Sequence, residues 1–301
     1  MKKIHILGIF CATIFSSQFA VAQEFYIRGG GGYSIENAST EFNNADPNGL
    51  TMIRQSTDVT VNPDGSTRVK SLNGTLGSGW KGNVTLGYMF NPYIGAELGF
   101  NYFSSDNKTI GKLTSPVMNS EAVAYLEGLD VMPAIYLTPN FLGINPYARV
   151  GLLIPVAGHL EIDSKAYAIN GGGPGTDISV NARTEVESKF SVGFAGAIGV
   201  TYPIGPKLHL FGEVEIKSLS IKSKSAEIKE YTTNAIVDGQ AVPVPGQQLA
   251  DLPVHEKKFI FEDEYTEGAT PDENSPRRIP TQYVNASGLG FNVGIRYSFG
   301  K

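Results

Sequence analysis

The chain has 301 residues, of which 29 are acidic and 24 basic, and its formal charge is −5. This acidic balance argues against nucleic-acid binding. The 35 glycines and the 10% aromatic content are typical of many strands and turns, and no long amphipathic helical pattern with caps is found. These features favour one large all-β domain over two ordinary ones.

The N-terminal residues have the pattern of an export signal. Two lysines follow Met1, an apolar run extends from Ile4 to Phe15, and an A-x-A motif ends at Ala22. The run is shorter than the roughly 20 apolar residues that a spanning helix needs. We therefore expect residues 1–22 to be cleaved as a signal peptide and residues 23–301 to form one mature domain.

Cleavage would also remove the only cysteine, Cys11. The mature chain would then hold no thiol, no disulfide and no thiolate metal site. Loss of Lys2 and Lys3 would leave 22 basic residues against 29 acidic ones, so the mature formal charge would be −7.

Alternation of apolar residues with polar or small ones predicts eight strands, because a strand between two different environments has a period of two. In chain order they are Phe25–Tyr33, Trp80–Phe90, Ile94–Tyr102, Ala124–Leu137, Tyr147–Ile154, Phe190–Tyr202, Leu208–Lys217 and Leu289–Phe299. Glycines dominate the second half of the first strand, so its two faces cannot be assigned from the pattern.

The connections between these strands alternate in length. Short turns are expected near Pro92, Pro139 and Pro206. Long segments are expected at about 34–78, 104–122, 159–187 and 225–284. This alternation predicts an eight-stranded antiparallel up-and-down transmembrane β-barrel, with short periplasmic turns and four long extracellular loops.

The two faces of the predicted strands differ in the way that a membrane barrel requires. The apolar face carries scarcely one ionisable residue, and a Lys or Arg near the bilayer midplane would cost about 2–4 kcal/mol. The other face is small and glycine-rich, which suits the narrow interior of an eight-stranded barrel. The polar residues expected in that lumen are Glu97, Asp130, Arg149, His209, Glu213, Glu215 and Arg296.

Three segments resemble the small outer-membrane β-barrel family, the porin-like domains of the OmpA, OmpX and OmpW type in Gram-negative bacteria. They are the opening "FYIRGGGGYS", the hairpin "GWKGNVTLGYMFNPYIGAELGFNYF" and the closing "GLGFNVGIRYSF". The resemblance covers the whole mature chain and implies a non-enzymatic outer-membrane barrel. Its implied partners are membrane lipid, lipopolysaccharide and the barrel-assembly machinery. That machinery usually reads a terminal aromatic residue, whereas Gly300 and Lys301 follow Phe299 here.

No motif in the chain predicts a cofactor or a metal site. Gly77, Gly79 and Gly82 spell G-x-G-x-x-G, but the motif runs directly into a strand, whereas a dinucleotide loop opens a helix. The mature histidines are His159, His209 and His255, and none has metal-ligand spacing.

The long connections contain three further signals. Asp64–Gly65 and Asp238–Gly239 predict hairpins that extend the barrel above the membrane. The last connection holds an acidic cluster that could bind divalent cations shared with lipopolysaccharide, although a solvated loop is the favoured interpretation. The cluster consists of Glu262, Asp263, Glu264, Glu267 and Asp272.

The leading functional hypothesis is a non-enzymatic barrel that anchors long external loops for envelope or surface interactions, with an external ligand that the sequence does not identify. A narrow pore or small-molecule uptake channel is the first alternative. A lipid-modifying enzyme is the second, and for it His159 with Glu161 and Ser164 is the one candidate site, against the simpler interpretation of a solvated rim histidine. The last alternative is a secreted soluble β-protein.

Overall fold

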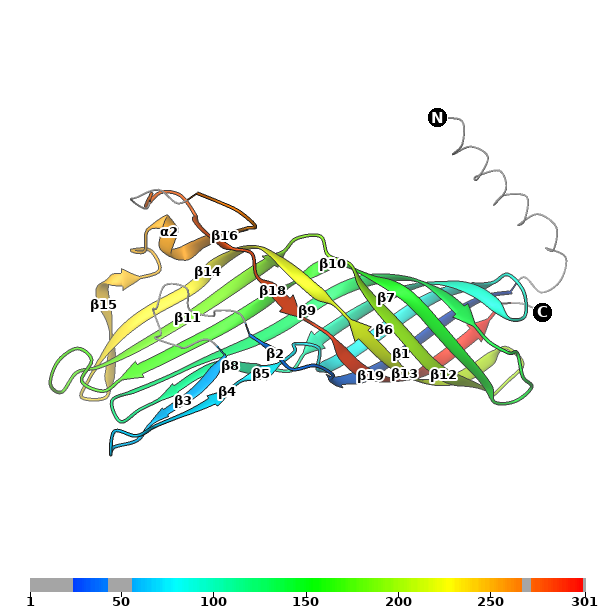
Figure 1. Ribbon diagram of the computed structural model, residues 1–301, viewed down its shortest axis with the longest axis horizontal. Coiled ribbons are helices and arrows are strands. Elements are labelled where there is room, and N and C mark those ends of the chain that lie inside the picture. Colours follow the sequence, from blue (N-terminus) through cyan, green and yellow to red (C-terminus); the bar gives the residue numbers. More distant parts are fainter. Residues whose placement is uncertain (1–23, 43–55, 267–271, 300–301) are drawn as a thin grey trace.

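Eight antiparallel strands close into a barrel in the computed structural model, which describes residues 24–42, 56–266 and 272–299 (Figure 1). The predicted signal segment, residues 1–22, lies outside the described residues. Each barrel strand pairs with the next, and the last strand pairs with the first. The barrel strands are β1 (Glu24–Glu36), β6 (Gly79–Met89), β7 (Ile94–Ser105), β9 (Met118–Leu137), β10 (Asn145–Ala168), β12 (Gly193–Pro203), β13 (Leu208–Ser218) and β19 (Gly288–Ser298).

The order and pairing of these strands confirm the predicted eight-stranded meander. The start of β1 pairs with the end of β19, with Tyr26 opposite Ser298, so both lie at the end of the barrel that carries the short turns. The first of these turns is closed by the side chain of Asn91, which accepts hydrogen bonds from the backbone N–H groups of Tyr93 and Ile94 at 2.8 and 2.9 Å. The Asn91 side chain thus stabilises the short turn between β6 and β7.

Two barrel strands are much longer than the sequence pattern predicted. β9 has 20 residues and β10 has 24, and their ladder continues to the pair Ala168–Met118. The strand end predicted near Ile154 was therefore wrong. The apolar outward face ends just beyond it, at Val156, and farther along the strand the outward side chains are polar, as at His159 and Glu161.

The long connections fold into a β-rich extension of the barrel (Figure 1). Its elements are β2 (Thr40–Glu41), β3 (Thr57–Val61), β4 (Thr67–Ser71), β5 (Asn73–Gly74), β8 (Lys108–Thr114), β11 (Asp177–Ser188), β14 (Ser220–Val237), β15 (Gln240–Gln248), α2 (Val254–Lys257), β16 (Lys258–Glu262), β17 (Arg277–Pro280) and β18 (Tyr283–Asn285). Among the described residues, no helix is long and apolar enough to span a membrane.

Two hairpins in this extension confirm the turn signals of the sequence. β3 and β4 are joined through Gly65, whose φ is +85°, and β14 and β15 are joined through Asp238 and Gly239, at +50° and +77°. Such left-handed backbone favours glycine and tolerates aspartate, which is why these residues occupy the turns.

The extension has a hydrophobic core of its own. Phe42, Phe103, Tyr231, Phe259 and Phe261 are all buried in it, together with aliphatic residues from β8, β9, β10 and β14. The long connections are therefore packed structure in their described parts, with a core that can order the strands.

The barrel portion has the opposite polarity, with its large apolar side chains on the outside. Ile198 and Val293 are 68% and 69% exposed at the centres of β12 and β19. A continuous outer surface of this kind fits hydrocarbon, and closure of the sheet leaves no strand edge for lipid to meet.

A lysine on this outer face should therefore destabilise the barrel according to its depth. We expect Val293→Lys to lower the free energy of unfolding in lipid bilayers by about 2–4 kcal/mol, because the ammonium must enter hydrocarbon. Val242→Lys, at an exposed position on β15 of the extension, should change it by no more than about 0.5 kcal/mol. Urea unfolding of both variants in vesicles measures the difference, and equal effects would contradict a lipid-facing β19.

Candidate functional site

A network of paired charges crosses the barrel lumen. Its members, here called the ionic layer, are Arg28, Lys81, Glu97, Arg149, Glu213 and Glu215. Glu213 is the centre, because its two carboxylate oxygens lie 2.7 Å from Arg28 and 2.6 Å from Arg149. Glu215 joins Arg149 and Lys81, each at 2.7 Å. Three cations thus face three carboxylates, and the layer is formally neutral.

Aromatic side chains fill the space around the ionic layer. The hydroxyl of Tyr26 donates to Glu97 at 2.8 Å and that of Tyr147 donates to Glu213 at 2.8 Å. The Arg28 guanidinium lies 4.0 Å from the centre of the Phe211 ring. Since the side chains of Arg28 and Glu213 are at most 3% exposed, the barrel is packed at this level.

The remaining predicted lumen residues lie above and below the ionic layer. Asp130 is buried and accepts a hydrogen bond from Asn101 at 2.6 Å. At the short-turn end, Arg296 lies opposite the half-buried His209 in the β13–β19 ladder, and its guanidinium is 3.7 Å from the centre of the Tyr26 ring.

The structure adds lumen residues that the sequence analysis did not single out. Arg28 was missed because glycines obscure the faces of the first strand, although its register opposite Arg296 puts it on the inward side. Asn292 is fully buried and donates to Glu213 at 2.8 Å. Lys217 is also buried, with its ammonium 3.9 Å from the centre of the Phe103 ring.

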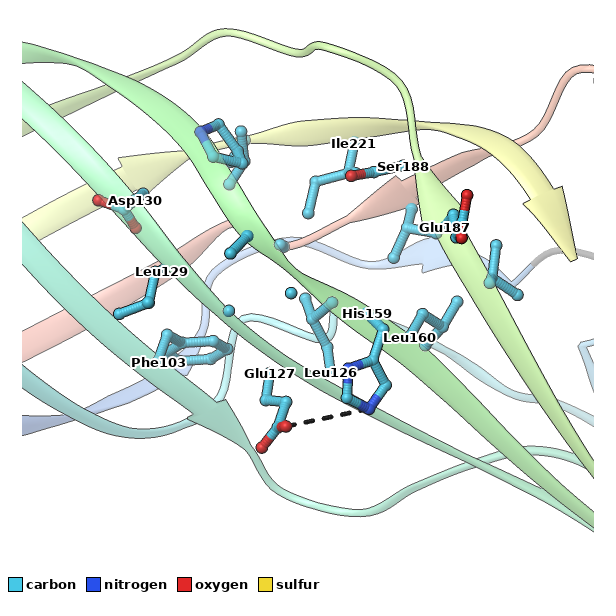
Figure 2. Close-up of a pocket in the computed structure, with 18 of the residues that line it drawn as sticks. Phe103, Leu126, Glu127, Leu129, Asp130, His159, Leu160, Glu187, Ser188 and Ile221 are labelled. Carbon is cyan, nitrogen blue, oxygen red and sulfur yellow. Dashed lines mark ion pairs between the residues drawn. The ribbon is translucent and has the colours of Figure 1, made fainter. Parts of the chain in front are cut away.

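A pocket of about 60 Å³ lies where the barrel meets the extension. Figure 2 shows Asp130 and Glu187 on opposite sides of it. Much of the lining is apolar and includes Phe103, Leu126 and Leu160. The pocket reaches the barrel wall at an irregular part of β10, where the ladder to β12 ends at Leu153, a bulge follows between Pro155 and Ala157, and the ladder to β11 begins at Leu160.

The residues considered for a lipid hydrolase do not come together. Ser164 is buried inside the extension, whereas His159 lies five residues earlier on the opposite face of β10. Its Nε2 is instead 3.9 Å from Glu127 Oε1, the ion pair drawn in Figure 2. The other oxygen of Glu127 accepts hydrogen bonds from Tyr102 and Tyr125 at 3.2 and 3.1 Å. The proposed grouping of His159 with Ser164 was therefore wrong, because strand alternation separates them.

The acidic cluster of the last connection is only partly described, since Glu267 lies outside the described residues. Asp263 pairs with Lys222 at 2.6 Å, and this hydrogen bond holds the pKa of the Asp263 carboxyl below its usual value. Within the described ranges, no three histidine, cysteine or acidic side chains gather in a way that could hold a metal ion.

The central position of Glu213 makes its charge important for stability. We expect Glu213→Gln to lower the free energy of unfolding by about 3–5 kcal/mol, because Arg28 and Arg149 would lose their shared carboxylate in a buried site. Glu230→Gln breaks an exposed pair with Arg183 and should cost less than about 1 kcal/mol. Urea titrations of both variants in the same lipid give the comparison, and a Glu213→Gln effect as small as that of the control would show that the ionic layer is dispensable.

The chain is similar to known outer-membrane proteins. A solved structure, that of the outer membrane protein OprG from Pseudomonas aeruginosa, is similar at 15% sequence identity, over 93% of this chain and 97% of that chain, with a TM-score of 0.41. Comparison with curated proteins finds no match. The family model for the outer membrane protein beta-barrel domain matches residues 7–239, which is most of the sequence. The chain therefore belongs to the outer membrane protein β-barrel domain family.

Proposed function

We propose that this protein is a non-enzymatic outer-membrane anchor whose barrel is sealed to ions and whose folded extension carries envelope or surface interactions. The observation that carries the proposal is the ionic layer. Arg28, Arg149 and Glu213 meet across the lumen at 2.6–2.7 Å, and their side chains are almost completely buried. Ions would have to break these pairs to pass, and a buried charge that loses its partner is costly.

The extension supports the second half of the proposal. It has its own hydrophobic core, and its outer faces carry mixed charges that form exposed ion pairs. Arg183, for example, contacts Asp163 and Glu230 at 3.1 and 3.0 Å. A folded and charged surface at the loop end of an outer-membrane barrel is suited to contact with other envelope components or with external molecules.

The same proposal includes the path of the protein to the membrane. Residues 1–22 would act as a cleaved export signal, the barrel-assembly machinery would insert the mature chain, and lipid and lipopolysaccharide would surround it.

Planar-bilayer recordings test the seal. Purified protein should give no large and stable conductance, because the neutral ionic layer and the surrounding aromatic rings occupy the lumen. An open pore would require a water-filled path past Glu213. Reproducible steps of a narrow channel at neutral pH would favour the uptake alternative instead.

Cysteine labelling tests the orientation. The mature chain is expected to be free of cysteine, so a single introduced thiol reports its own side of the membrane. We expect Asp238→Cys, at the tip of the β14–β15 hairpin, to react with an impermeant maleimide in intact cells. Leu142→Cys, in the fully exposed turn between β9 and β10, should react only after the cells are permeabilised. The reverse labelling pattern would invert the proposed topology.

A further inference from the structure

The sheet of the extension ends at β4, whereas the barrel sheet closes on itself. In the described part of the chain the order of the extension sheet is β4–β3–β8–β9–β10–β11–β14–β15, and β4 pairs with β3 alone. Figure 1 shows the β3–β4 hairpin at the lower border of the extension. All five residues of β4 are exposed. This strand therefore has one edge that no described strand covers.

The hydrogen bonds of the hairpin show which backbone groups of β4 face this free edge. At one end of the β3–β4 ladder the N–H of Leu72 donates to the carbonyl of Ser56 at 2.7 Å. At the other end the N–H of Asn62 donates to the carbonyl of Ser66 at 2.8 Å. Because bonded and non-bonded pairs alternate in an antiparallel ladder, the even-numbered residues of β4 bond to β3 and the odd-numbered ones turn away from it. The odd-numbered residues are Thr67, Val69 and Ser71.

The strand at the opposite border is protected against pairing in a way that β4 is not. In the described ranges β15 pairs only with β14, and it contains Pro243 and Pro245. Proline has no N–H to donate to an added strand, and natural sheets use it to block their edges. β4 contains no proline, and its protection is the charge of Arg68 and Lys70. Charge excludes only partners of the same sign.

The charge of Lys70 is the end of a row that crosses the outer face of the sheet. The row takes one residue from each of five neighbouring strands, and the signs of the charges alternate along it. From the free edge inward its members are Lys70, Asp58, Lys112, Glu121 and Lys165. Opposite charges on directly opposed residues stabilise a strand pair, and like charges destabilise it. An added strand should therefore carry an acidic residue opposite Lys70.

The neighbours of Lys70 on β4 extend this preference. Arg68 is opposite Thr60, which is uncharged, so the β3–β4 ladder gives its guanidinium no opposed carboxylate. Val69 lies on the other face, opposite the buried Val59, and is itself 52% exposed. An apolar residue placed opposite Val69 would cover this exposed area. The edge thus matches a strand in which acidic, apolar and acidic residues follow one another.

A second copy of the chain fits this edge poorly. Antiparallel pairing of two β4 strands about Val69 would place Arg68 of each copy opposite Lys70 of the other. Both contacts would join like charges, which destabilise a strand pair. An acidic strand meets the same two positions with opposite charge. Charge complementarity therefore favours an acidic partner over self-association.

We infer that β4 binds an extended acidic segment of another protein by strand addition. The backbone groups of Thr67, Val69 and Ser71 would bond to the segment, and its carboxylates would lie opposite Arg68 and Lys70. In this mode of recognition the main-chain bonds supply affinity and the alternate side chains supply specificity. The inference rests on the proposed function, because it names a class of partner for the surface of the extension.

Fluorescence anisotropy with a short peptide tests the edge in folded protein held in lipid nanodiscs. The probe is Ser-Thr-Glu-Val-Glu-Thr-Ser, with a dye at its N-terminus and an amide at its C-terminus, and empty nanodiscs correct for contact with lipid. We expect saturable binding that weakens as salt is raised, because the charges at this edge are exposed.

Two control peptides separate the contributions of charge and backbone. Replacing both glutamates by lysine inverts the charge, and replacing the valine by proline keeps the charge but removes the N–H that would donate to the carbonyl of Val69. Each control should bind at least tenfold more weakly, since it loses one of the two kinds of contact. This comparison uses only the native protein, so it stands whether or not any variant folds.

Val69→Pro tests the backbone contact from the protein side. It removes an N–H that makes no bond to β3, so the hairpin should keep its fold while binding of the glutamate peptide falls at least tenfold. Val69→Thr is the matched control, because it keeps the N–H and the preference for a strand. It should bind the glutamate peptide with an affinity close to that of the native protein.

Lys70→Glu tests the charge. It should weaken binding of the glutamate peptide and strengthen binding of the lysine peptide, because the opposed charges change sign. Lys165→Glu makes the same change at an exposed position of the same row, four strands from the edge. Solvent screens an exposed charge at that distance, so this control should leave the binding of both peptides unchanged.

Four results would overturn the inference. Three are equal binding of the three peptides, equal binding of the glutamate peptide by Val69→Pro and Val69→Thr, and no binding above that of empty nanodiscs. The fourth is a native dimer in sedimentation velocity that Val69→Pro abolishes, because it would assign the edge to a second copy. Failure of the proposed function has other signs: a large conductance would refute the seal and reversed cysteine labelling would refute the topology, whereas loss of peptide binding alone would refute only the edge.

Discussion

The packing of this barrel depends on charge neutralisation inside a space that eight strands make too narrow for bulk water. Glu213 is shared by Arg28 and Arg149, and every other pair in the ionic layer extends from this centre. A charge taken out of water is stable only when a partner and hydrogen bonds replace its hydration. In this lumen the cations and carboxylates pair with one another, and the tyrosines and Asn292 donate further hydrogen bonds to the carboxylates.

On the outer face of the barrel the side chains must be apolar, because they face lipid. This requirement ends where the extension begins. On β9 the even-numbered residues face inward along the whole strand, with Asp130 and Met132 in the barrel and Ala122 and Leu126 in the extension. The side chains on this inward face change from charged in the barrel to apolar in the extension, although the same set of alternate residues faces inward throughout. The outward face changes from apolar to polar at the same level. The outward face of one continuous strand therefore contacts lipid along the barrel and water along the extension.

This change of surroundings decides which features of the fold and of the lumen could be predicted from the sequence. The eight strands and their short turns were predictable because hydrocarbon imposes an uninterrupted apolar face, and the inward polar residues follow by alternation. Arg28 was hidden by glycines, which mark no face. The course of β10 past Ile154 was hidden because the bulge between Pro155 and Ala157 shifts the alternation, so that Leu153 and Leu160 both point inward. Register between distant strands, which a sequence pattern does not contain, decides which charges meet.

Packing is hardest to complete at the junction of the barrel and the extension. Below it the interior is held by paired charges, and above it by apolar side chains such as Leu126 and Leu160, so the boundary must place a charged surface against an apolar one. Lys217 occupies that boundary and satisfies both sides only in part, with its stem buried and its ammonium on an aromatic ring. The bulge in β10 at the same level interrupts the regular ladder beside it. A pocket lined by apolar side chains together with Lys217 and Asp130 lies where these two irregularities coincide.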